Sequence, residues 1–230
     1  MIRAVGACDS DGVAVTSDPR RLFTERPDAY ARFIRAMRYP QGLRAFWRTS
    51  SLLRSGMRIL EAGCGTGALT FAVWDAAAER RMSLAALDAF DLTPAMLDRL
   101  RASIARRGVT AIALAEADVL NLEALPSGWE GYDLVVSASM LEYVPRDRFV
   151  EALAGLRRRL RDDGRFVLFM SRRNPFTRLL VGRWWQSNLY TAVELREAFR
   201  AAGYRRIAFP GFPLAARHLA TWGHVVEAEA

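Results

Sequence analysis

Short apolar runs alternate along the chain with longer segments in which apolar residues recur at helical spacing. The apolar runs cover residues 57–62, 84–90, 111–115, 132–138 and 165–171, with further candidates at 204–209 and 222–227. Apolar runs of this length, bounded by turn residues, are typical of buried strands. Their alternation with helices predicts an α/β fold: a mostly parallel sheet with helices on both faces.

Cap residues set the expected helix boundaries. A helix over 68–80 follows a glycine loop, and a second begins with Thr93 as N-cap and Pro94 as first helical residue, ending at Gly108. A third is expected over 146–161, followed by a turn at 162–164. Thr191 and Glu194 form a capping-box pattern for a helix over 191–202, which Gly203 ends.

Two segments do not follow this alternation of strands and helices: residues 1–50 and residues 172–190. Residues 1–50 are amphipathic and helical in pattern, and without a repeat or linker we expect them to cap the core at 51–230 within a single domain. Residues 172–190 mix arginine with aromatic and aliphatic side chains, Trp184 and Trp185 among them. This segment is interpreted as a lid over an acceptor site; an amphipathic membrane-surface patch or a simply packed helix remain alternatives.

Composition narrows the chemistry. All 33 basic residues are arginine, which excludes lysine Schiff bases and the lysine-dependent phosphate loop. Cys8 and Cys64 form no pairing pattern and His218 and His224 lie near the end, so we expect no metal site or disulfide framework. The net charge of +8 fits nucleic acid or an anionic surface, but the arginines are spread among carboxylates and indicate solvated helix faces. Residues 1–12 lack a signal pattern, and no apolar run would cross a bilayer, so we expect a cytoplasmic protein.

Candidate ligand-binding residues fall where the expected strands end. The glycine loop 63–67 allows close backbone approach, and the helix after it presents N–H groups to an anion. Asp91 is placed to accept the hydroxyls of a ribose, and Asp118 the exocyclic amine of an adenine. The alternatives are a plain tight turn for the loop, Asp88 as the ribose ligand, and an ordinary loop acid at Asp118.

The glycine spacing alone also fits a dinucleotide-binding loop. Three details favour a methyl donor instead. Glu61 places a carboxylate where it would repel a pyrophosphate, Gly67 adds a glycine that the dinucleotide pattern does not require, and the acid at Asp118 has no required role in binding NAD.

Residues 59–67 (ILEAGCGTG) resemble the first motif of class I S-adenosylmethionine-dependent methyltransferases. Residues 90–97 (FDLTPAML), 117–119 (ADV) and 132–138 (YDLVVSA) resemble the motifs of the next three strands, and the likeness runs from about 52 to 210. The resemblance implies a Rossmann-like sheet of seven strands whose last strand runs antiparallel. It also implies S-adenosyl-L-methionine as cofactor.

By this resemblance, Glu61 and the loop Gly63, Cys64, Gly65, Thr66 and Gly67 would hold the methionine end of the cofactor. Asp91 and Leu92 would bind the ribose and adenine, Asp118 and Val119 the adenine edge, and Ser137 would lie near the methyl group. Candidates for the acceptor site are Tyr30, Trp47, Glu142, Tyr143, Trp184 and Trp185. Ordinary packing or surface exposure is the more common role for side chains such as the first four. No catalytic residue is assigned, because the motifs contain no general base and both histidines are distant in sequence.

The expected activity is transfer of a methyl group to a small, apolar or anionic acceptor, since the chain is compact and shows no added recognition domain. The alternatives are a nucleic-acid methyltransferase and a non-catalytic cofactor-binding protein. Against the first, residues 137–140 (SASM) replace the Asn/Asp-Pro-Pro-aromatic motif that amino-directed enzymes of that kind carry after the fourth strand.

Overall fold

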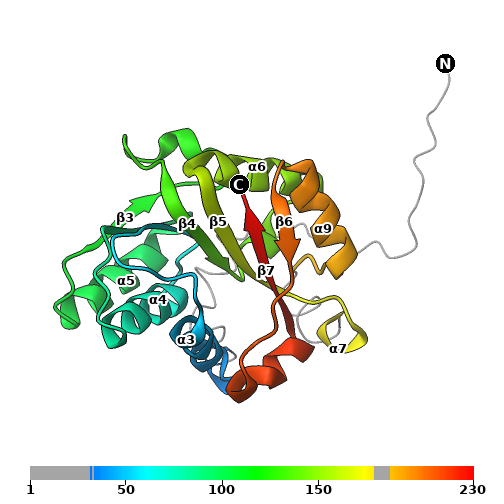
Figure 1. The fold of residues 1–230 in the computed structure, drawn as a ribbon, viewed down its shortest axis with the longest axis horizontal. Coiled ribbons are helices and arrows are strands. Elements are labelled where there is room, and N and C mark those ends of the chain that lie inside the picture. Colours follow the sequence, from blue (N-terminus) through cyan, green and yellow to red (C-terminus); the bar gives the residue numbers. More distant parts are fainter. Residues whose placement is uncertain (1–31, 33, 179–186) are drawn as a thin grey trace.

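The computed structural model describes residue 32, residues 34–178 and residues 187–230, and its centre is one twisted sheet (Figure 1). The strands are β1 (Arg58–Ala62), β2 (Ala86–Asp91), β3 (Ile112–Glu116), β4 (Tyr132–Ala138), β5 (Leu160–Ser171), β6 (Arg205–Ala208) and β7 (Gly223–Glu229). Their order across the seven-stranded sheet is β3-β2-β1-β4-β5-β7-β6.

Strand direction confirms the predicted architecture. Strands β1 to β5 pair in parallel, whereas β7 lies antiparallel between β5 and β6. The strand order reverses between β1 and β4. In sheets of this kind ligands bind beyond the carboxyl ends of the strands at such a reversal.

Helices cover both faces of the sheet (Figure 1). The first face carries α3 (Tyr39–Thr49), α4 (Ala68–Glu79) and α5 (Pro94–Arg106), whose buried side chains pack on β1, β2 and β5. The other face carries α6 (Phe149–Arg159) and α9 (Ala192–Ala201). Short helices complete the described chain: η1 (Leu122–Ala124), η2 (Leu141–Tyr143), η3 (Arg146–Arg148), α7 (Pro175–Thr177) and η5 (Leu214–Thr221).

Most helix boundaries follow the expected caps. Thr191 and Glu194 form the capping box in front of α9, and Gly108 and Gly203 take positive φ angles just after α5 and α9. Two details differ. Thr93 occupies the N-cap position of α5, but its side chain makes no capping hydrogen bond. The expected helix over 146–161 is η3 followed by α6, which ends at Arg159.

The turn expected at 162–164 lies inside β5. Leu160 pairs with Tyr132, and the register between β4 and β5 shifts before Arg165 pairs with Leu134. The shift absorbs the Asp-Asp-Gly sequence as an irregularity in one continuous strand. The Gly164 carbonyl also accepts a hydrogen bond from the Ala230 N–H.

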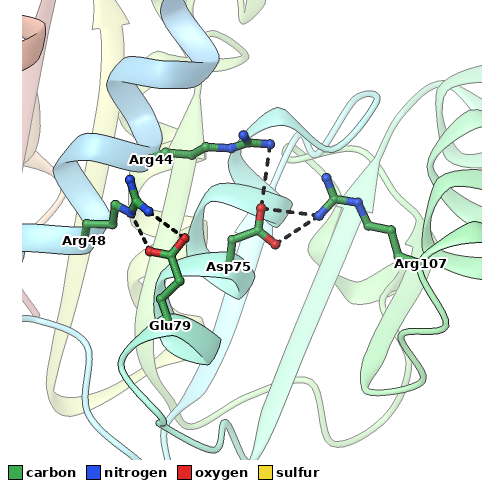
Figure 2. Close-up of polar contacts among 5 residues, drawn as sticks. All are labelled: Arg44, Arg48, Asp75, Glu79 and Arg107. Carbon is green, nitrogen blue, oxygen red and sulfur yellow. Dashed lines mark hydrogen bonds and ion pairs between the residues drawn. The ribbon is translucent and has the colours of Figure 1, made fainter.

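Helix α3 lies against α4 and η5, and ion pairs flank its contact with α4 (Figure 2). Arg48 forms two hydrogen bonds with the Glu79 carboxylate. Asp75 forms ion pairs with Arg44 of α3, at 3.7 Å, and with Arg107, just after α5, at 3.0 Å. These pairs are exposed to solvent, so they contribute little to stability.

Apolar burial holds α3 more firmly. Trp47 is fully buried in the core, with its ring edge-on to Phe46 and Phe169. On the η5 side, a Cβ added to Gly42 would lie 2.0 Å from Leu219 Cδ1, so the two elements approach closely at this glycine. Helix α3 is therefore part of the core.

Replacing Trp47 with alanine should lower the free energy of unfolding by about 3–5 kcal/mol, because it removes a buried aromatic side chain. Glu79→Gln should have a much smaller effect, because it breaks only an exposed ion pair. Urea denaturation followed by circular dichroism measures both. Equal losses in the two variants would show that the ion pairs, and not apolar burial, hold α3.

Candidate functional site

The glycine loop after β1 is a tight turn fixed by backbone hydrogen bonds. The N–H groups of Gly63 and Cys64 both donate to the Phe90 carbonyl, at 2.8 and 3.0 Å, and the Gly67 N–H donates to the Cys64 carbonyl at 2.9 Å. Gly67 then occupies the N-cap position of α4. The loop therefore presents the start of α4 at the carboxyl edge of the sheet, as predicted from the sequence.

The three loop glycines all have positive φ, but the space around them differs. A Cβ on Gly63 would lie 2.2 Å from Met140 Cγ, and one on Gly67 would lie 2.5 Å from Leu100 Cδ1. A Cβ on Gly65 would meet no atom within 4 Å. Gly63 and Gly67 are thus required by packing, whereas Gly65 faces open space where a ligand can approach the backbone.

Asp91 joins this loop to the end of β2. Its Oδ2 accepts the Gly65 N–H at 2.8 Å, and its Oδ1 accepts the Thr93 N–H at 2.9 Å. A carboxylate offers about four acceptor sites, so two remain for the hydroxyls of a sugar. Burial raises the pKa of Asp91, while the hydrogen bonds from Thr93 and Gly65 oppose the rise.

Asp88, the alternative ribose ligand, is engaged elsewhere. Its Oδ2 accepts a hydrogen bond from the Tyr132 hydroxyl at 2.7 Å, and both residues are buried within the sheet. Asp88 lies in the middle of β2, opposite Leu60, whereas Asp91 lies at the carboxyl end of the strand. The geometry favours Asp91.

Glu61 is a buried carboxyl at the end of β1. It is 1% exposed, and its Oε2 has no hydrogen-bond partner among the described residues. Burial raises its pKa to about 8, and the nearby Asp91 carboxylate adds to the rise. A buried polar atom without a partner is costly. The amino group of a bound S-adenosylmethionine would supply the missing partner, so the residues of this site fit that cofactor.

The adenine-side residues lie after β3. Asp118 Oδ1 accepts the Leu120 N–H at 2.9 Å, which closes a local turn, and Val119 is buried behind it. Leu92 and Thr66 are partly exposed, whereas the Cys64 side chain is buried beside α5. Cys64 therefore offers a ligand its backbone and not its thiol.

Ser137 lies near the carboxyl end of β4. Its side chain is fully buried, and its hydroxyl donates to the Ala62 carbonyl at 2.8 Å. It therefore fixes β4 to β1 beneath the glycine loop. Ser139, directly after β4, is partly exposed.

A pocket of about 620 Å³, part of it open solvent, lies beyond the ends of β4 and β5 and the start of β7. Its polar wall contains Ser139, Glu142 and His224, and much of the rest is aromatic. Ser139 has a φ of 53°, and its hydroxyl contacts the Tyr39 hydroxyl at 3.1 Å. A left-handed conformation at a serine is unusual and is found at functional sites more often than elsewhere.

The segment from Ser139 to Tyr143, here called the β4 loop, contacts both the glycine loop and this pocket. Met140 packs on Gly63, while Ser139, Glu142 and Tyr143 line the pocket. The pocket and the glycine loop are therefore both next to this one short segment.

The acceptor candidates divide between the pocket and other places. Glu142 and Tyr143 line the pocket. Trp47 packs in the core under α3 and is not among the pocket-lining residues. Tyr30, Trp184, Trp185 and part of the expected lid lie outside the described residues.

Sequence reasoning missed Tyr39, Ser139 and His224, all of which line the pocket. Only Ser139 carried a usable signal, because it directly follows a buried strand. His224 is far in sequence from the glycine loop and the other motifs. The antiparallel pairing of β7 with β5 nevertheless places it beside Met170. Within the described ranges, no cluster of His, Cys, Asp or Glu is arranged to hold a metal ion, and no helix is long and apolar enough to span a bilayer.

Comparison with known families agrees with this geometry. Residues 59–164, from β1 into β5, match the model of a family described as "Methyltransferase domain". This part of the chain is therefore similar to a methyltransferase domain. No curated protein sequence gives a significant match to the chain.

Solved structures share the fold at low sequence identity. The S-adenosylmethionine-dependent methyltransferase SibL superposes with a TM-score of 0.68 at 20% identity, over 92% of this chain and 61% of its own. A phosphoethanolamine N-methyltransferase 2 of Haemonchus contortus gives 0.67 at 14% identity, over 93% and 60%. A methyltransferase of Mesorhizobium loti gives 0.57 at 20% identity, over 78% and 94%. The chain thus spans about 60% of the length of the first two structures.

Gly65→Ala should lower the free energy of unfolding by about 1–2 kcal/mol, because alanine at a positive φ is strained. Gly108→Ala is the matched control: its φ is also positive, its Cβ would also meet nothing within 4 Å, and it lies outside the site. Only Gly65→Ala should also weaken binding of S-adenosylhomocysteine, measured by calorimetry. Similar affinities in both variants would show that no ligand approaches the backbone at Gly65.

The stability of the protein without ligand should fall as pH rises. Burial raises the pKa of Glu61 to about 8 and that of Glu142 to about 7, from an ordinary 4.5. The folded protein therefore binds more protons than the unfolded chain above pH 4.5, and stability is lost up to pH 7 or 8.

The expected loss is on the order of 1 kcal/mol per pH unit for each group, measured by urea denaturation from pH 5 to 8. Glu61→Gln should flatten the slope, whereas Glu151→Gln, which removes an exposed carboxylate, should leave it unchanged. A slope that Glu61→Gln does not alter would contradict the assigned burial of this carboxyl.

Proposed function

We propose that the protein transfers a methyl group from S-adenosylmethionine to a small-molecule acceptor bound in the pocket beside the β4 loop. The observation that carries this proposal is the arrangement of Glu61, Gly65 and Asp91 at the reversal point of the sheet, together with a pocket that the β4 loop also lines. One site suits an adenosyl sulfonium and the other a second reactant.

Each of these residues has a distinct task in the proposed reaction. Glu61 would pair with the amino group of the cofactor, and the remaining acceptor sites of Asp91 would receive the ribose hydroxyls. Asp118 would receive the adenine amine. The bound cofactor supplies an activated methyl group, so the protein mainly has to hold the acceptor in line and exclude water, which can lower a barrier by about 7–11 kcal/mol.

A small acceptor is favoured over a nucleic acid by the form of the pocket. The pocket is lined by residues of this chain, and aromatic and aliphatic side chains make up much of its wall. The arginines described in the structure form many of their contacts with carboxylates on the surface, as Arg48 does with Glu79 and Arg165 with Glu227. Both features fit a single compact molecule better than a polyanion.

S-adenosylmethionine and S-adenosylhomocysteine should each raise the thermal midpoint of the protein, whereas NAD should not. Ligand at one hundred times its dissociation constant adds about 2.7 kcal/mol to the free energy of unfolding. A thermal-shift titration with the three compounds makes the measurement. Stabilisation by NAD, without stabilisation by the other two compounds, would show that the glycine loop binds a dinucleotide and would contradict the proposal.

A further inference from the structure

The pocket beside the β4 loop contains a buried carboxyl that has no counter-ion among the described residues. Glu142 is 2% exposed, and within the described part of the chain its two carboxylate oxygens accept only from Ser171, one from the backbone N–H at 2.8 Å and the other from the hydroxyl at 3.2 Å. Among the described residues no arginine or histidine forms an ion pair with it, although the chain has 33 basic residues. A carboxylate in such a place is costly unless a cation joins it.

The surroundings of Glu142 are suited to an organic cation. Rings of Tyr39, Tyr143, Phe169, Phe212 and Trp222 line the same pocket. Aromatic faces attract ammonium groups, most strongly where water is excluded. No arginine is found among the described lining residues, so the pocket offers an anionic acceptor no charged partner.

His224 adds a second unsatisfied polar group to this wall. It is 7% exposed, and its Nε2 has no hydrogen-bond partner among the described residues. Burial and the nearby Arg172 lower its pKa, so the ring is neutral at pH 7 and adds no positive charge to the pocket.

We propose that this pocket binds an acceptor with an aromatic or hydrocarbon body and a primary or secondary amine, whose nitrogen pairs with Glu142. The inference rests on the proposed methyltransferase function and narrows its substrate class from small molecules in general to amines. It also favours a cationic acceptor over the anionic one that was among the expectations from the sequence.

The same carboxylate can prepare the amine for reaction. An amine attacks only with a free lone pair, so the bound ammonium first gives one N–H proton to Glu142, which becomes a carboxylic acid. The nitrogen then forms a bond to the methyl carbon while the C–S bond breaks and sulfur keeps the electron pair. The product leaves as a methylated ammonium ion, and Glu142 returns its proton to solvent.

The protonation state of Glu142 gives this pairing a pH dependence. The titratable groups that share the pocket are Tyr39, Tyr143 and His224, and none of them is a cation at pH 7. Without ligand, burial keeps the pKa of Glu142 at about 7. Amine binding should therefore strengthen from pH 6 to pH 8, where the carboxylate is ionised and an aliphatic amine is still protonated.

Three probes with one aromatic body test the proposal: 2-phenylethylamine, 2-phenylethanol and phenylacetate. Calorimetry first measures binding of S-adenosylhomocysteine, and the probes are then titrated into the saturated protein at pH 8. The amine should bind about tenfold or more tightly than the alcohol, because it makes a charged hydrogen bond, and phenylacetate should bind most weakly. No binding of S-adenosylhomocysteine would defeat the proposed function itself, independently of the amine assignment.

Glu142→Gln keeps the shape and removes the charge. Its affinity for the amine should fall about tenfold, to that of the alcohol, while alcohol and S-adenosylhomocysteine binding change less than about twofold. Glu151→Gln on α6 is the control and should behave as the wild type. An amine that binds no better than the alcohol or phenylacetate, an amine that does not bind at all, or an unchanged preference in Glu142→Gln would overturn the proposal. If Glu142→Gln does not fold, the relative affinities of the wild-type protein for the three probes test the proposal.

Discussion

The carboxylate of Asp91 is the contact on which the site depends. It lies at the end of β2 and accepts backbone N–H groups from Gly65 in the glycine loop and from Thr93 at the start of α5. One side chain thereby fixes two loops that follow neighbouring parallel strands. Because the glycine loop is held by a hydrogen bond to the residue that we propose as the ribose ligand, the shape of the loop is set before any cofactor binds.

The β4 loop extends this order to the second half of the site. Ser137 ties β4 to the Ala62 carbonyl, and Met140 fills the space that a side chain at Gly63 would need. Ser139 and Glu142, on either side of Met140, turn to the pocket at the ends of β5 and β7. The proposed cofactor site and the proposed acceptor pocket thus share one short segment. The hydroxyl of Tyr39, in α3, contacts the Ser139 hydroxyl of that segment.

Sequence patterns predicted the parts of the fold that depend on local rules. The apolar runs, the glycine loop and the Thr191–Glu194 capping box each follow from residues close together in the chain. The same reasoning missed contacts that tertiary packing creates: the Ser137 hydroxyl bonds a carbonyl 75 residues away, and Tyr39 meets Ser139 across 100 residues. His224 reached the pocket only through the pairing of β7 with β5, which no local pattern specifies.

The most direct test of the account compares Asp91→Asn with Asp88→Asn in the binding of S-adenosylhomocysteine. An amide at position 91 would turn its N–H donors against the backbone donors of Gly65 or Thr93, whereas an amide at position 88 can still accept from the Tyr132 hydroxyl. Calorimetry should show at least about a tenfold loss of affinity for Asp91→Asn, consistent with loss of hydrogen bonds to a charged group. Asp88→Asn should bind nearly as the wild type. Unchanged binding by Asp91→Asn, with loss in Asp88→Asn, would contradict the account.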